Sequence, residues 1–140
     1  MKYRELLDAI RDLGFEEDPI LDEYKSIIVN AVNRSQHTIF YSVVDKAKAF
    51  FKAEAEMAGK EYIHLPPTPI TADTPDDFVI ELPERTIELL PLLSAYYVLL
   101  DDDERKAVMY YNTYDNMVND ILSVALSGRG SKIVGGMRLG

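Results

Sequence analysis

The feature that most constrains this fold is a helical segment, residues 87–100, that is apolar on nearly every side. Its apolar residues are Ile87, Leu89, Leu90, Leu92, Leu93, Ala95, Tyr96, Tyr97, Val98, Leu99 and Leu100. A helix at the surface of a soluble protein is apolar along one stripe only. We therefore expect the rest of the chain to bury this helix on most of its sides.

Clear helix boundaries surround this segment. Pro83 and Glu84 begin it, and an acidic run over residues 101–104 ends it. The same run caps a further helix, in which apolar residues recur at helical spacing from Ala107 to Ala125. We expect that helix to end at residues 127–128, where serine is followed by glycine.

The first half of the chain also predicts helices. Residues 3–13 carry leucine and isoleucine at helical spacing, and Gly14 follows as a stop. A second helix is expected from residues 18–19, an Asp-Pro pair, to about Arg34, and a third over residues 45–58. Residues 38–44 are β-branched and aromatic, which favours a strand, but helical patterns flank them, so their assignment stays open.

Residues 61–82 have a different character from the helices around them. Residues 61–65 and 77–82 each resemble a short strand, and prolines 66, 67 and 69 force an extended connection between them. The two segments are expected to pair as a small β-hairpin or flap. The predicted fold is therefore mainly α: a helical bundle over residues 1–127 with this β excursion, followed by a flexible basic C-terminal tail over residues 128–140.

Composition limits the possible functions of this 140-residue chain, whose length suits one domain. Its net charge of −9 opposes general binding to nucleic acid. The absence of cysteine excludes disulfides and thiolate metal sites. No apolar run is long enough to span a membrane, and the N-terminus begins an amphipathic pattern, so we expect a protein made and kept in the cytosol without a membrane partner.

No motif for catalysis or for a cofactor emerges from the sequence. His37 and His64 lack an acid or a second histidine at helical metal-site spacing. The glycine-rich residues 128–132 lack the spacing of a phosphate loop, and residues 101–104 lack the glycine and spacing of a calcium loop. We therefore expect no metal, no cofactor and no enzymatic activity.

Tyrosine gives a weak indication of an interaction protein. The chain has nine tyrosines, several of them clustered at residues 96–97 and 110–114. Tyrosine combines a large contact area with a polar tip and is enriched at protein interfaces. Packing between helices explains any single one of these residues equally well.

A resemblance to a known family lies in residues 80–115. Residues 80–102 have the sequence IELPERTIELLPLLSAYYVLLDD, an L-P-E turn followed by a helix of the form L-L-P-L-[LY]-x-A. Residues 103–115, DERKAVMYYNTYD, follow the form D-x-x-[KR]-A-x-x-Y-x-x-x-[YF]. In these features, and in the helix expected over residues 23–33, the chain resembles the head-tail connector (adaptor) proteins of tailed bacteriophages.

The resemblance implies a virion structural protein, made in the host cytoplasm and located in the neck at the head-tail interface. Such subunits form a homo-oligomeric ring, with about twelve copies, between the portal protein and the tail or stopper proteins. DNA would pass through the lumen without specific binding. Asp101, Asp102, Asp103 and Glu104 are candidates for the lumen or rim, where negative charge prevents DNA from sticking.

The C-terminal tail is the predicted partner-binding segment, because it is basic and the rest of the chain is acidic. We expect it to bind the portal or the neighbouring subunit, with Ile133 and Val134 adding a strand edge. The residues assigned to this contact are Arg129, Lys132, Ile133, Val134, Met137, Arg138 and Leu139. The alternative hypothesis is a helical oligomeric adaptor or regulatory protein with no place in a virion.

Overall fold

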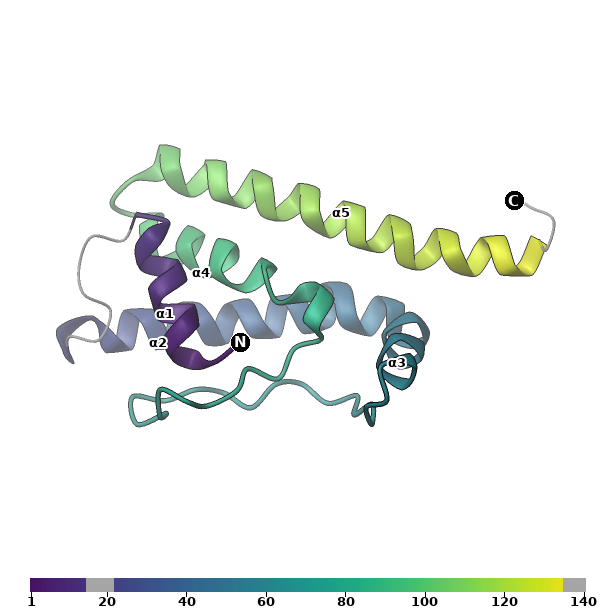
Figure 1. The fold of residues 1–140 in the computed structure, drawn as a ribbon. Helices are drawn as coiled ribbons and strands as arrows, with labels where there is room; N and C mark the ends of the chain where they lie inside the picture. Colours follow the sequence, from purple (N-terminus) through teal and green to yellow (C-terminus); the bar gives the residue numbers. More distant parts are fainter. Residues whose placement is uncertain (15–21, 135–140) are drawn as a thin grey trace.

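The computed structural model describes residues 1–14 and 22–134, and among them the side chains of residues 1–14 and 25–127 (Figure 1). Their structure is mainly helical, as predicted, and contains no β-strand within these ranges. The elements, in chain order, are α1 (Tyr3–Asp12), α2 (Asp22–Ile39), the π-helical turn η1 (Phe40–Val44), the 3-10 turn η2 (Asp45–Ala47), α3 (Lys48–Met57), the 3-10 turn η3 (Glu84–Thr86), α4 (Leu89–Leu99) and α5 (Glu104–Val134).

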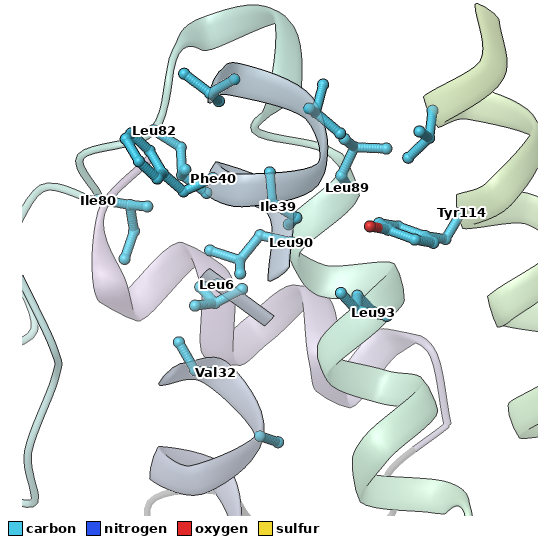
Figure 2. Close-up of a cluster of buried hydrophobic side chains, with 14 of the residues drawn as sticks. Leu6, Val32, Ile39, Phe40, Ile80, Leu82, Leu89, Leu90, Leu93 and Tyr114 are labelled. Atoms are coloured by element: carbon cyan, nitrogen blue, oxygen red, sulfur yellow. The ribbon is translucent and has the colours of Figure 1, made fainter. Parts of the chain in front are cut away.

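Helix α4 is the centre of the core, as its apolar sequence predicts. It packs against α1, α2 and α5. Leu89, Leu90 and Leu93 are completely buried. Figure 2 shows these leucines between α2 and α5, with Tyr114 reaching towards them from α5.

The first helix ends where glycine predicts. Leu6, Leu7 and Ile10 form its buried side, and the chain leaves the helix through Gly14, whose φ of 114° lies in the left-handed region that favours glycine. A Cβ atom at Gly14 would meet the side chain of Lys106 at 2.7 Å. Those atoms belong to the flexible end of a lysine, which can move aside, so glycine is needed here for the backbone angle.

The structure resolves residues 38–44, which the sequence left open, as helical. α2 continues to Ile39 and then widens into the π-helical turn η1. Ile39, Val43 and Val44 are fully or almost fully buried in the core. Burial of these side chains against α4 and α5 outweighs their preference for strands, because β-propensity mainly reflects packing on a sheet that is absent here.

The predicted third helix is confirmed with a later start. Residues 45–47 form the 3-10 turn η2, and α3 runs from Lys48 to Met57. Gly59 follows with a φ of 74°, again in the left-handed region.

The predicted β-hairpin is wrong. Residues 77–82 do not pair with residues 61–65; they lie beside the N-terminus, where Ile80 N–H donates to the carbonyl of Met1 (2.9 Å) and Tyr3 N–H to that of Phe78 (2.8 Å). Lys2 and Val79 form a single antiparallel bridge. Residues 61–82, which we call the strap, therefore run as an extended segment beside the helices. Their buried anchors, Ile70, Ile80 and Leu82, face the helical core.

The end of the last helix was also predicted wrongly. α5 does not stop at residues 127–128 but continues to Val134, which makes it about 46 Å long at 1.5 Å per residue. Its C-terminal end extends beyond α3 (Figure 1). Gly128 and Gly130 lie inside the helix; glycine costs about 1 kcal/mol there but keeps its N–H donor, so it weakens a helix without breaking it as proline does.

Candidate interaction surface

The predicted acidic residues, 101–104, form the corner between α4 and α5, and all four are exposed. The corner closes through two backbone hydrogen bonds to the carbonyl of Leu99, from Asp102 (3.0 Å) and from Asp103 (2.8 Å). Asp103 caps α5, because its carboxylate accepts from the N–H of Lys106 at 3.1 Å. The side chains of Asp101 and Asp102 form no hydrogen bond and no ion pair with the described residues.

The predicted tail residues are placed in part. Arg129, Lys132, Ile133 and Val134 belong to the last turns of α5, so the proposed strand edge at Ile133 and Val134 is wrong: their backbone is helical. Their side chains lie outside the described set. Met137, Arg138 and Leu139 fall outside the described residues altogether.

A cluster of tyrosines joins α4 to α5. We call Tyr96, Tyr97, Tyr111 and Tyr114 the tyrosine cluster. Their ring centres lie 5.0 Å apart for Tyr96 and Tyr97, 4.9 Å for Tyr96 and Tyr111, and 5.7 Å for Tyr111 and Tyr114. These spacings are within the range of favourable tilted ring contacts. The cluster thus forms a continuous aromatic surface across the two helices.

The four tyrosines divide between core and surface. Tyr114 is buried, whereas Tyr96 and Tyr97 are half-buried and Tyr111 is 39% exposed. Burial raises the pKa of Tyr114 to about 12, and the nearby Tyr111, Tyr97 and Asp115 add to this rise. Tyr114 therefore anchors the cluster in the core, and the other three present ring area to solvent.

Arg34 on α2 extends the aromatic surface. Its guanidinium carbon lies 4.3 Å from the ring centre of Tyr97, a cation–π geometry. His37 and Tyr41 follow Arg34 at positions i+3 and i+7 on the same side of the helix, and their rings lie 4.6 Å apart. Tyr41 is 45% exposed. The surface therefore spans α2, α4 and α5.

A second group of polar side chains fastens the strap to the helices. His64 contacts the carboxylate of Asp45 through Nε2 (2.8 Å) and the hydroxyl of Tyr62 through Nδ1 (2.5 Å). Its ring lies 5.0 Å from that of Phe40. Asn33 binds both backbone groups of Ile70, accepting from its N–H (2.8 Å) and donating to its carbonyl (2.9 Å).

These contacts hold the strap against α2 and the turn η2. Side chains replace the strand ladder that the strap lacks. Among the described residues, no three histidine or acidic side chains gather in a way that could hold a metal ion. No helix in the described ranges has the length and apolar character needed to cross a membrane.

Sequence reasoning found the clustered tyrosines but missed Arg34 and His64. Each of these residues acts through a partner from another element, so no local spacing reveals it. Comparisons with family models, with curated proteins and with solved structures gave no match for this chain.

Proposed function

We propose that the protein is a head-tail connector (adaptor) subunit of a tailed bacteriophage, which forms a ring in the neck of the virion between portal and tail. The observation that carries the proposal is the arrangement of residues 80–115. The segment that resembles the connector family forms one continuous unit: the turn η3, the buried helix α4, the acidic corner and the first turns of α5.

The physical properties of the fold support a mechanical role. A ring that bridges two large assemblies needs a stiff subunit, and α4 supplies stiffness because neighbouring helices bury most of its side chains. The long helix α5 packs along α4 and extends beyond α3, which gives each subunit an arm (Figure 1). We assign this arm the contact with the portal or with the neighbouring subunit.

The charge distribution supports the same role. All 24 acidic residues precede Ile121, whereas residues 121–140 carry Arg129, Lys132 and Arg138 and no acidic side chain. An acidic body repels DNA that passes through a ring, and a basic arm attracts an acidic partner surface. The exposed acidic corner is our candidate for the lumen or rim of the ring.

The test compares a truncated chain that ends at Gly128 with the full chain. The quantity measured is the binding of each to the portal protein encoded in the same genome. Ala125 is the last buried residue of α5 that the structure describes, so this truncation leaves the described core intact. We expect an unchanged circular dichroism spectrum apart from the lost helical turns, and loss of portal binding. Unchanged portal binding would remove the arm from the proposal.

The competing hypothesis is a non-virion helical adaptor that acts as a small oligomer, and the tyrosine cluster suits it equally well because tyrosine-rich surfaces serve many kinds of partner. Native mass spectrometry separates the two hypotheses. A connector is expected to give a high-order assembly of fixed stoichiometry when portal is present. A dimer that stays a dimer under those conditions supports the competing hypothesis.

A further inference from the structure

Among the residues whose side chains are described, two arginines lie over aromatic rings, and one of these two has a carboxylate partner. Arg85 lies 5.3 Å from the ring centre of Phe50 and donates to Glu54 through Nε (2.8 Å) and Nη2 (2.5 Å). Arg34 lies closer to its ring, that of Tyr97, yet makes no hydrogen bond or ion pair with the described residues. Its guanidinium is held in place while its donors remain available.

The surroundings of Arg34 favour a protein partner. Exposed tyrosine and arginine side chains are the residue types most enriched at the energetic centres of interfaces. Arg34 lies over Tyr97, which contacts Tyr96 and through it Tyr111. Tyr41, in the turn η1 that follows α2, is also exposed. A planar guanidinium presents paired donors that match a carboxylate, so the partner should bring an acidic group to this place.

The acidic corner supplies that group from the chain itself. Asp101 and Asp102 are exposed, and neither carboxylate has a cationic or hydrogen-bond partner among the described side chains. Asp103 differs, because it caps α5. The chain thus displays an arginine that lacks a carboxylate and, four residues beyond Tyr97 at the end of α4, carboxylates that lack a cation.

We propose that the surface formed by Arg34 with the partly or fully exposed tyrosines Tyr41, Tyr96, Tyr97 and Tyr111 binds the acidic corner of a second copy of this chain. The inference rests on the proposed ring-forming function and names the contact between neighbouring subunits. The contact joins two different patches, so copies that associate head to tail leave one patch of each kind free for the next copy. Such head-to-tail contacts extend until a ring closes.

Charge reversal tests this contact with the full-length chain alone, by sedimentation velocity over a range of protein concentrations. We expect Arg34→Glu to weaken self-association at least about tenfold, because it places like charges opposite each other. The paired substitution Asp101→Arg with Asp102→Arg should do the same. Lys52→Glu on the exposed side of α3 makes the same change in net charge as Arg34→Glu and should leave self-association unchanged.

The decisive variant combines Arg34→Glu with Asp101→Arg and Asp102→Arg in one chain. This chain should associate again, because both sides of the contact change sign together. Circular dichroism of each variant confirms that it folds. Restored association of the combined variant supports the contact, and continued dissociation of a folded combined variant overturns it.

Two results would overturn the contact without deciding the proposed function: self-association of the wild-type chain that Arg34→Glu does not weaken, and a wild-type chain that stays a monomer at every concentration. In both cases the connector role still depends on portal binding. A chain that self-associates through these charges but does not bind the portal would support the contact between copies. That result would contradict the connector role.

Discussion

The imidazole Nε2 of His64 lies 2.8 Å from Oδ1 of Asp45, and this contact fastens the strap to the 3-10 turn η2. The two residues are 19 positions apart and belong to different elements. No backbone hydrogen bonds of a strand ladder hold residues 61–69, so side chains take over the anchoring of this segment.

Replacing His64 should therefore loosen the strap. We expect His64→Ala to lower the free energy of unfolding by about 1–2 kcal/mol, because it removes the bond to Asp45 and the ring contact with Phe40. Residues 61–69 should also become more sensitive to limited proteolysis. The exposed His37 is the matched control, and His37→Ala should change the free energy of unfolding by less than about 0.5 kcal/mol. Equal effects of the two substitutions would contradict the anchoring role of His64.

Tyr114 should make stability depend on alkaline pH. Its pKa is about 12 in the folded chain, mainly through burial, against an ordinary value of 10.0. The unfolded chain therefore loses this proton first, and the free energy of unfolding should fall as pH rises from about 10 to about 12. A pKa that rises from 10.0 to about 12 corresponds to a contribution of roughly 3 kcal/mol, at about 1.4 kcal/mol for each pKa unit.

Urea unfolding of wild type and of Tyr114→Phe at increasing pH isolates this effect, since phenylalanine keeps the packing and removes the titrating group. Between about pH 10 and pH 12, the free energy of unfolding should fall less in Tyr114→Phe than in wild type. Tyr41→Phe, at an exposed ring that does not contribute to the raised pKa of Tyr114, should behave like wild type. A fall of equal size in wild type and Tyr114→Phe would show that Tyr114 does not titrate abnormally.

Two completely buried serines should respond differently to the same substitution. The hydroxyl of Ser35 donates to the carbonyl of Ala31 at 2.7 Å, whereas the hydroxyl of Ser94 has no partner among the described residues. A buried hydroxyl without a partner is costly, so Ser94→Ala should leave the protein unchanged or more stable. Ser35→Ala removes a hydrogen bond and should leave it about 1 kcal/mol less stable than Ser94→Ala. Thermal unfolding of the two variants under one set of conditions measures this difference, and a lower stability of Ser94→Ala would contradict it.

Local sequence patterns predicted much of the helical framework. The glycines at positions 14 and 59 mark the ends of α1 and α3, and Asp103 caps α5, because each of these signals acts within one turn of backbone. The central position of α4 was also predictable, since an all-apolar helix has to be buried.

The assignment that stayed open and the hairpin that was wrong both lie where distant contacts override local preference. Val43 and Val44 favour strands but are buried in the core as helix, and residues 77–82 alternate like a strand but bond to the N-terminus. The end of α5 was misplaced because Gly128 weakens a helix without stopping it. At the candidate surface, the sequence already showed the clustered tyrosines. It did not single out Arg34, because Arg34 and Tyr97 belong to different helices and meet only in the folded chain.

Electron microscopy of the purified protein mixed with its portal protein tests the central claim most directly. The proposed connector role predicts closed rings of this chain, coaxial with the portal and of one fixed stoichiometry. Portal particles that remain unchanged, beside single copies of this chain, would contradict it.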